Sequence, residues 1–488
     1  MAEKIRQGIR SFLQIEPAQG NVVHIQEVMD YETNAIKNRI WYRGESEELS
    51  ALYKSVNVDS TMFWKAVPTV GREIRKIHTG LPGIIVDILT SIVIADMNDI
   101  SVSEKQNEWD AIVEDNNFSE LAADAITETL IIGDGAFKFT INTDISQYPM
   151  IEFVSGENIE YKRQHGRVIE IVFKTLYKAN FKTYELEERY GKNYIITKLY
   201  DHNREVPLNT IEELSELPAE VTYNGDFIMA VPFMIFKSSK WKGRGKSVFD
   251  TKCDNFDSLD EAWSQWMDAL RRGRSKEYVP DTLIPRNPAT GEPLKPNAFD
   301  NQYIQCEGGM GEGENNKVEL IQPNIPHESY LATYITALDL CLQGLISPST
   351  LGIDTKKLDN ADAQREKEKA TLYTRNKIVE AVQNTFPDVV NVAIKTYEVL
   401  MNQPVTKQTV DIPFGEYANP SFESQVETVT KAKQGGVMSI EASVEELYGD
   451  SKDKSWKTEE IKRLKEEQGI VGMEEPAVNT EGLNVSEV

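Results

Sequence analysis

Cysteine is scarce in this chain of 488 residues, which contains only three, and the scarcity excludes two kinds of domain. Cys253, Cys306 and Cys341 are too few and too far apart for a framework of disulfide bonds or for a zinc motif. The sequence therefore predicts reduced thiols in a compartment with a cytosol-like redox state.

Long apolar runs are also missing. The longest, residues 81–95, is interrupted by Asp87 and falls short of the roughly 20 residues that cross a bilayer. It is typical of a buried amphipathic helix. The first 13 residues place apolar side chains at helical spacing with charges between them, and they lack the unbroken apolar core of a signal peptide. We expect no membrane span and no export by the usual route.

An excess of positive charge is absent as well. The chain has 53 lysines and arginines against 78 aspartates and glutamates, which gives a formal net charge of −25. Proteins that bind nucleic acid tightly neutralise phosphates with clustered basic residues. Any contact with DNA is therefore expected to be local or weak.

The motifs of nucleotide-binding proteins are incomplete. Residues 243–247, Gly-Arg-Gly-Lys-Ser, resemble the end of a P-loop, but the first glycine of that motif would fall on Lys240. The glycine-rich stretch 308–313 lacks the last glycine of a dinucleotide fingerprint, because Glu314 stands there. We interpret the first segment as a turn that leads into a helix and the second as a flexible loop.

Metal and catalytic motifs are not evident either. The five histidines, at positions 24, 78, 165, 202 and 327, have no metal-ligand spacing, and neither a G-x-S-x-G nor an H-E-x-x-H motif occurs. We expect no metal, no cofactor and no enzymatic activity. A catalytic site assembled from residues far apart in the sequence stays open, because one sequence cannot connect them.

Residues 1 to about 250 alternate helical segments with strand-like ones. Apolar and polar residues alternate over 136–141, 169–173 and 194–200, which is the period of half-buried strands. This part of the chain is predicted to be a mixed α+β body.

The pattern then changes to two long helices that flank a small module. Residues 247–250, Ser-Val-Phe-Asp, have the form of a capping box, and apolar residues recur after them at helical spacing to about Arg274. Several prolines and glycines in 277–325 favour turns and short strands. Pro326 suits the first turn of the second helix. Its apolar residues, at spacings of four and three, are Leu331, Ile335, Leu338, Leu342 and Leu345.

A polar loop, residues 347–360, follows and leads into a third helix whose opening is densely charged with both signs. Pro387 predicts a break or kink in that helix, and residues 409–414 are strand-like. From about residue 420 the sequence predicts short helices, with an acidic disordered tail after Gly472.

The order helix, Pro/Gly-rich module, helix, polar loop, charged helix resembles the stem, clip, stem, tunnel loop and tunnel-wing helix of the tailed-bacteriophage portal (head-to-tail connector) family, particularly portals of phages of Gram-positive bacteria. Segments 243–249, 360–368 and 436–449 resemble that family, and 39–44 and 132–138 resemble its wing more loosely. The resemblance implies an α+β portal fold with a mixed α/β wing, long stem helices, a small β-rich clip and a helical crown, assembled as a ring. The implied parts are a wing at 1–250, a first stem helix at 251–276, a clip at 277–325, a second stem helix at 326–346, a tunnel loop at 347–360, a tunnel and wing helix with a strand at 361–415, and a crown with the acidic tail at 416–488.

The resemblance implies a structural subunit and not an enzyme. About twelve copies would form a ring at a unique capsid vertex, through which double-stranded DNA is packaged and ejected. The implied partners are other copies of the chain, the DNA, the major capsid protein, the scaffolding protein, the terminase large subunit and the head-tail adaptor. Assembly would take place in the host cytoplasm, and the final location would be the virion. Two alternatives stay open: another virion ring component, such as an adaptor or baseplate subunit, and a DNA-processing enzyme.

Two groups of candidate site residues follow from the resemblance. The tunnel loop would touch passing DNA, with Lys356 and Lys357 meeting phosphates, although a solvated loop is the alternative. A basic cluster ends the first stem helix, where it would complement the helix dipole and pair with acidic neighbouring subunits, or contact DNA phosphate or capsid protein. The loop candidates are Ser347, Ser349, Thr350, Asp354, Thr355, Lys356, Lys357 and Asn360, and the basic cluster is Arg271, Arg272, Arg274 and Lys276.

Four aromatic residues also lie in the two stem helices: Trp263, Trp266, Tyr330 and Tyr334. We expect them to pack between the stems of adjacent subunits. Base stacking is disfavoured, because a channel for intact duplex offers no unstacked bases.

Overall fold

The structure, a computed structural model, describes most of the chain between residues 29 and 467. The chain forms two compact units, one made of residues up to 353 with 370–414, and the other of 354–369 with the residues from 415 onward. The described residues are 29–56, 61–67, 74–179, 181–202, 204–274, 276–280, 284, 286–293, 303–306, 319–321, 323–353, 361–415, 422–448 and 454–467.

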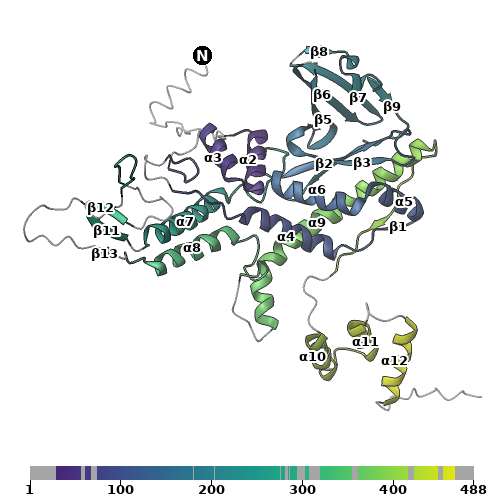
Figure 1. Ribbon diagram of the computed structural model, residues 1–488. Coiled ribbons are helices and arrows are strands. Elements are labelled where there is room, and N and C mark those ends of the chain that lie inside the picture. Colours follow the sequence, from purple (N-terminus) through teal and green to yellow (C-terminus); the bar gives the residue numbers. More distant parts are fainter. Residues whose placement is uncertain are drawn as a thin grey trace, which may run out of the picture. The chain divides into compact units, whose positions relative to one another are not determined.

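Helix α6 (Phe118–Ile132) lies at the centre of the larger unit (Figure 1). It packs against α2 (Tyr31–Arg43), α4 (Leu81–Asp96) and α5 (Gln106–Asn116), and α3 (Ser46–Ser55) packs on α2. Helix α4 buries one apolar face, including Ile85, Leu89 and Val93, and confirms the buried amphipathic helix that the sequence predicts there. These helices supply much of one hydrophobic core.

Helix α6 also packs against a small antiparallel sheet. In this sheet β2 (Asp134–Thr140) lies between β3 (Met150–Ser155) and β10 (Ala230–Met234). The ring of Phe386 contacts Phe137 at 5.6 Å and Phe233 at 5.7 Å between centroids. The sheet and α9 (Ala361–Leu400), the helix that carries Phe386, therefore share the core with α6.

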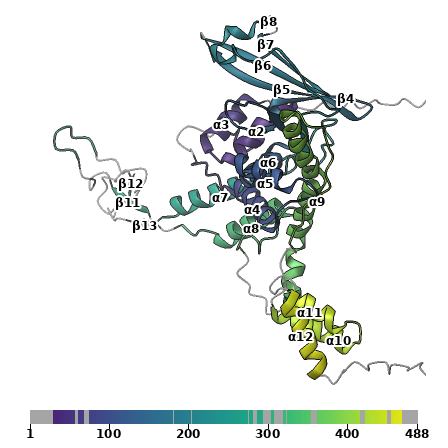
Figure 2. The same ribbon diagram turned by 90° about the vertical axis from the view of Figure 1, so that its right-hand side faces the viewer.

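A second sheet is a six-stranded antiparallel meander that rises from the same unit (Figure 2). Its strands have a smaller core of their own, which includes Leu186 and Leu199. Two further strands, β1 (Ser101–Val102) and β14 (Val410–Asp411), pair with each other. The meander consists of β4 (Ile159–Gln164), β5 (Arg167–Ala179), β6 (Lys182–Gly191), β7 (Tyr194–Asp201) and β8 (Arg204–Val206). Strand β9 (Glu220–Thr222) also pairs with β7. Short 3-10 helices lie at η1 (Gly156–Asn158), η2 (Leu208–Thr210) and η3 (Glu212–Leu214).

The three strand-like segments predicted from alternation are confirmed, since they coincide with β2, β5 and β7. Helices and β strands contribute side chains to the same hydrophobic core in the larger unit. The fold class is therefore α+β, as predicted.

Two long helices flank a small sheet, also as predicted. Helix α7 (Cys253–Arg272) precedes the sheet and α8 (His327–Leu342) follows it. Within the sheet, β11 (Lys276–Pro280) lies between β12 (Tyr303–Cys306) and β13 (Glu319–Ile321). The glycine-rich stretch 308–313 lies outside the described residues.

The predicted capping box is wrong as a helix start. The Asp250 carboxylate does accept a hydrogen bond from the Ser247 N–H at 3.0 Å. The Ser247 hydroxyl, however, donates to Leu130 O at 3.2 Å and accepts from the Phe249 N–H, so it is engaged by the core. The helix begins later, with Lys252 as its N-cap residue and no side-chain cap.

Helix α9 (Ala361–Leu400) runs through Pro387, so the predicted break does not occur. Phe386, Val389 and Val390 are fully buried on either side of the proline, and this packing holds the helix together although the proline cannot donate a backbone hydrogen bond. The smaller unit contains the predicted short helices α10 (Phe422–Gln434), α11 (Ile440–Tyr448) and α12 (Lys454–Glu467). The predicted disordered tail lies outside the described residues.

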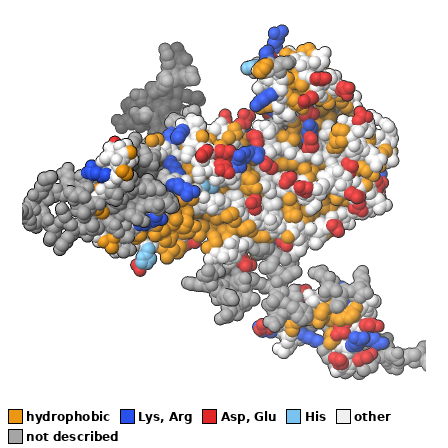
Figure 3. Space-filling model, in the orientation of Figure 1, with side chains coloured by type: hydrophobic (Ala, Val, Ile, Leu, Met, Phe, Trp, Pro, Cys, Tyr) orange, Lys and Arg blue, Asp and Glu red, His pale blue; other side chains and the backbone are white. Residues whose placement is uncertain are grey.

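Acidic side chains are scattered over the visible surface of the larger unit rather than gathered in one place (Figure 3). Exposed acidic side chains also pair with basic ones, as Asp226 does with Lys192 Nζ at 3.0 Å. On this face the negative charge is therefore not concentrated in one patch.

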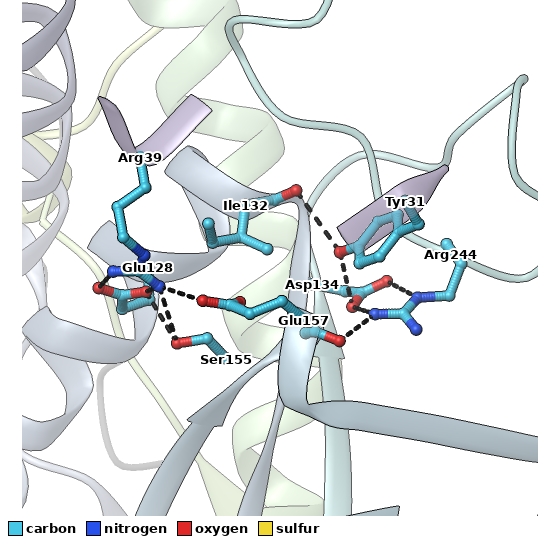
Figure 4. A network of polar contacts seen from close by, with 9 residues as sticks. Tyr31, Arg39, Glu128, Ile132, Asp134, Ser155, Glu157 and Arg244 are labelled. Atoms are coloured by element: carbon cyan, nitrogen blue, oxygen red, sulfur yellow. Dashed lines mark hydrogen bonds and ion pairs between the residues drawn. The ribbon is translucent and has the colours of Figure 1, made fainter. Parts of the chain in front are cut away.

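A buried ion pair joins distant segments of the larger unit (Figure 4). Asp134, fully buried at the start of β2, accepts hydrogen bonds from Arg244 at 3.0 and 2.8 Å. It also accepts from the Tyr31 hydroxyl at 3.0 Å and from the Gly245 N–H at 2.5 Å. Burial, followed by the negative charge of Asp134, raises the pKa of Tyr31 well above its ordinary value. The phenol therefore stays protonated and keeps donating.

Arg244 has further acceptors that complete the network. Its guanidinium donates to Ile159 O at 2.9 Å and to Gly156 O at 2.5 Å. The loop after β10 is thereby bound to the junction of the two sheets, which fixes the position of the chain that enters α7.

Arg244→Leu is expected to lower the free energy of unfolding of the larger unit by about 3 to 5 kcal/mol, because it leaves the Asp134 carboxylate buried without its counter-ion. Urea-induced unfolding followed by tryptophan fluorescence measures the change. Arg43→Ala is the control, since its ion pair with Glu48 is exposed. We expect that variant to lose less than about 1 kcal/mol. If both variants lost the same free energy of unfolding, the buried ion pair would contribute no more to stability than the exposed one.

Candidate functional site

Helices α7 and α8 lie side by side and antiparallel (Figures 1 and 2). Near the start of α7, the Asn255 side-chain amide donates to Leu340 O, near the end of α8, at 3.1 Å. Near the other end of the pair, the ring of Trp266 stacks on Tyr330 with centroids 6.4 Å apart. The two helices thus form a hairpin that carries the small β sheet between them.

The aromatic residues pack against one another within one chain, and packing between the stems of adjacent subunits stays a prediction. Trp263 contacts Tyr334 at 5.4 Å and Trp266 at 5.8 Å between ring centroids. The hairpin brings these rings together by itself, because the two helices run side by side at this level. Each ring remains partly exposed.

The apolar stripe of α8 changes its environment along the helix. Leu338 and Leu342, toward its end, are buried, with 8% and 2% of their surface exposed. Leu331 and Ile335, two turns and one turn before Leu338 on the same face, are 45% and 47% exposed. Figure 3 shows the hydrophobic side chains gathered over this region. Among the described residues, the first half of the stripe is therefore only about half covered.

Asp260, fully buried in the middle of α7, binds a segment that is distant in sequence. One carboxylate oxygen accepts from the Thr79 N–H at 2.9 Å and from its hydroxyl at 3.0 Å. The other accepts from the Trp64 indole N–H at 3.1 Å and lies 2.6 Å from His78 Nδ1. Three side chains and one backbone amide thus converge on a single carboxylate.

Two neighbouring residues of α7 extend this contact. The Asp257 carboxylate accepts from the backbone N–H groups of Phe63 and Trp64 at 2.9 and 3.1 Å. Burial raises the pKa of Asp257, and these two hydrogen bonds oppose the rise. One helical turn beyond Asp260, the Ser264 hydroxyl accepts from the Ile77 N–H at 2.9 Å. The chain before α4 is therefore bound along the first half of α7.

His78 is enclosed rather than available to a ligand. Its ring lies 5.4 Å from that of Trp41 and 6.3 Å from that of Trp64, measured between centroids. Its Nε2 atom is buried and has no hydrogen-bond partner among the described residues. A side chain at Gly44, where φ is +73°, would meet the His78 ring at 2.9 Å. We interpret His78 as part of the packing that holds α7.

The sequence analysis missed Asp257, Asp260 and Ser264 because it counted only apolar positions in α7. Their spacing of three and four residues places them on one face of the helix. Polar residues at this spacing among the apolar positions of α7 would have indicated a buried polar contact. Its partners could not be identified from the sequence, since they lie almost 200 residues away.

The basic cluster lies where α7 ends. Arg272 forms an ion pair with Asp268 at 2.6 Å, one turn earlier in the same helix. Arg271 and Arg274 are exposed, and the side chain of Lys276 lies outside the described residues. The pair to Asp268 fits the expected role at a helix end, and contact with DNA or capsid protein stays a prediction.

The first part of the predicted tunnel loop is held against α9. Ser347 is buried, and its N–H donates to the Thr371 hydroxyl at 2.8 Å. The Thr350 and Thr371 hydroxyls lie 2.8 Å apart, and the Ser349 hydroxyl is buried without a partner among the described residues. A role in touching DNA stays a prediction for these residues. Five other candidates lie outside the described residues: Asp354, Thr355, Lys356, Lys357 and Asn360.

Residues 243–247 form a turn, as interpreted from the sequence. A side chain at Gly245 would collide with the carbonyl oxygen of Gly133, so the two backbones require glycine here. Because no helix starts directly after Ser247, the backbone cradle of a P-loop is not formed.

Two kinds of site were sought among the described residues. No cluster of three or more His, Cys, Asp or Glu side chains there could hold a metal ion. In the same residues, every helix is too short or too polar to cross a membrane.

Comparison with known proteins yields structural likenesses. No protein-family model matches the chain, and no curated protein matches its sequence significantly. The neck of a native GTA particle, computed with C12 symmetry, has a TM-score of 0.37 and 12% identity, over 79% of this chain and 90% of that chain. The neck of an empty GTA particle, computed with C6 symmetry, has a TM-score of 0.37 and 12% identity, over 74% and 88% of the two chains. Likenesses as weak as these assign no function.

Asp260→Asn is expected to lower the free energy of unfolding by about 3 kcal/mol or more, because the amide turns an NH₂ group toward donors that need an acceptor. Hydrogen exchange at the Thr79 amide and the Trp64 indole should accelerate with it. The control is Asp254→Asn, an exposed carboxylate in the first turn of the same helix, with an expected loss below about 1 kcal/mol. Unchanged exchange at Thr79 would contradict the anchoring role of Asp260.

Proposed function

We propose that this chain is the structural subunit of a ring that encloses a channel for double-stranded DNA at one vertex of a phage-like capsid, the role of a portal. The order of its segments resembles that family, and the helix–sheet–helix hairpin has the form expected of stem and clip. The proposal includes no enzymatic activity.

The half-covered apolar stripe of α8 is the observation that carries the proposal. Leu331 and Ile335 continue the line of Leu338 and Leu342, which the chain's own core covers. Full burial of a side chain of this size contributes about 1.5 to 3 kcal/mol. A partner surface that covers Leu331 and Ile335 would gain about half of that energy for each, because each is about half exposed. A second copy of the chain would offer such a surface on its own α7.

Such a contact is heterologous, since α8 of one copy would meet α7 of the next. Repeated about an axis, a heterologous contact closes into a ring when its rotation divides the circle. Leu270, near the end of α7, is 43% exposed and lies in the outer half of the hairpin, where this contact is proposed. The rings of Trp266 and Tyr330 would stiffen both surfaces, since they are stacked within each chain.

The net charge of −25 fits a channel through which DNA must move. Strong neutralisation of phosphates would hold the duplex in place, whereas an acidic wall keeps it centred. Lys356 and Lys357 would provide brief contacts that weaken with salt. We propose that the module between α7 and α8 docks the terminase large subunit and later the head-tail adaptor. The amino-terminal body would meet the major capsid protein and the scaffolding protein.

Leu331→Glu combined with Ile335→Glu is expected to prevent ring closure, because it places charges in the proposed contact. Native mass spectrometry should give a species near twelve copies of the 55.3 kDa chain, about 660 kDa, for the unaltered protein and a monomer for the variant. Ile145→Glu with Leu176→Glu is the matched control, since both residues are more exposed and lie outside α8. Rings of unchanged mass in the α8 variant would exclude this interface.

Lys356→Ala combined with Lys357→Ala is expected to weaken binding of a short duplex by the assembled ring. The slope of log K against log salt concentration should fall by about 0.9 for each phosphate that the variant no longer neutralises. Fluorescence anisotropy at several salt concentrations measures it. Lys54→Ala with Lys407→Ala removes the same charge at exposed positions elsewhere and should leave the slope unchanged. An equal effect of both variants would assign the binding to overall charge instead of the loop.

A further inference from the structure

A pocket of about 320 Å³ lies in the larger unit, away from the α7–α8 aromatic contact. Its volume falls within the range of small-ligand sites. Three segments form it: the turn and loop before α7, the residues directly after α8, and one face of α9. Its lining residues are Phe236, Lys246, Ser247, Val248, Thr251, Gly344, Leu345, Tyr373, Thr374 and Lys377.

The pocket gathers positive charge in a strongly acidic chain. Lys246 and Lys377 line it, and neither ammonium group has an ion pair or a hydrogen bond among the described residues. No aspartate or glutamate lines the pocket. The acidic residue nearest to Lys246 in sequence, Asp250, accepts hydrogen bonds from the side-chain amides of Asn34 and Asn38, at 2.8 and 3.0 Å.

A third lysine adds to the positive potential. The Lys252 ammonium donates to Leu340 O and Gln343 O, both at 2.8 Å, at the end of α8. Burial lowers the pKa of Lys252, and repulsion by the charge of Lys246 lowers it further. Lys252 thus places a third ammonium group near the pocket, bound to the end of α8.

Hydroxyl groups complete the set of donors. The hydroxyls of Thr251 and Tyr373 donate to no group in the part of the chain that the structure describes, and both side chains line the pocket. Phe236, Val248 and Leu345 form apolar walls. Thr251, Tyr373 and Lys377 are exposed, so an anion can reach their donor groups from solvent.

We infer that this pocket binds a phosphate group, held by Lys246 and Lys377 and by the hydroxyls of Thr251 and Tyr373. A phosphate has several oxygens that accept hydrogen bonds, so it can be bound by ammonium and hydroxyl donors together. The site differs from a P-loop, because side chains and not a backbone cradle would hold the phosphate.

The phosphate has two sources with the same chemistry: the backbone of duplex DNA and a free nucleotide or phosphate ion. Gly344 and Leu345 connect the pocket to the segment proposed to approach DNA, which would suit a backbone phosphate. The inference does not depend on ring formation, because every residue that lines the pocket belongs to one chain.

The test measures binding of three probes to the full-length protein: inorganic phosphate and dAMP by calorimetry, and a 20-base-pair duplex by fluorescence anisotropy. In Lys246→Ala combined with Lys377→Ala, the affinity for at least one probe should fall tenfold or more. Lys54→Ala with Lys407→Ala removes the same charge outside the pocket and should change each affinity less than twofold. A loss confined to the duplex identifies the DNA backbone as the source, and a loss for dAMP or phosphate identifies a free ligand.

Thr251→Val provides a second variant with little change in shape. It should weaken the same probe about threefold while the thermal unfolding temperature stays within 2 °C of the unaltered protein. If no probe binds the unaltered protein more tightly than 1 mM, or if the pocket variants lose no more affinity than the control, the inference is wrong. The native mass of the lysine variants is measured in parallel, so failure of the phosphate site and failure of ring assembly give separate results.

Discussion

The carboxylate of Asp260 holds the first half of α7 against the rest of the larger unit, and the placement of both long helices depends on it. A buried carboxylate is costly unless donors surround it, and here the donors come from Trp64, His78 and Thr79. They satisfy the charge only when the chain before α4 lies along α7. Since α8 packs on α7, its last turns are fixed by the same contact, and Leu338 and Leu342 become buried.

Among the described residues, the outer half of the hairpin has no comparable buried carboxylate contact. Its contacts are aromatic rings that are themselves half-exposed, such as Trp266 on Tyr330. An apolar stripe that is covered at one end and open at the other is well suited to association, because the helix is already ordered before a partner arrives. The entropy of ordering the helix is then part of folding and does not oppose assembly.

Periodicity predicted the elements well, and its failures have physical causes. Strands β2, β5 and β7 and helices α4, α7 and α8 follow from local patterns. The capping box failed because the core engages the Ser247 hydroxyl, and Pro387 did not end α9 because buried residues flank it. Whether Trp263 packs within or between chains depends on hairpin geometry, which no local pattern contains. The donors of the phosphate pocket come from segments more than 100 residues apart, so the sequence could not unite them.

The acidic composition and a phosphate pocket are compatible because electrostatic forces in salt water have a short range. At physiological ionic strength charges are screened over about 8 Å, so the net charge of −25 acts mainly on the approach of DNA. Within a pocket that lacks carboxylates, Lys246 and Lys377 determine the local potential. A protein of this kind can repel a duplex as a whole and still hold a single phosphate. That combination suits contacts that must form and break repeatedly, since each one is weak and the surroundings favour its release.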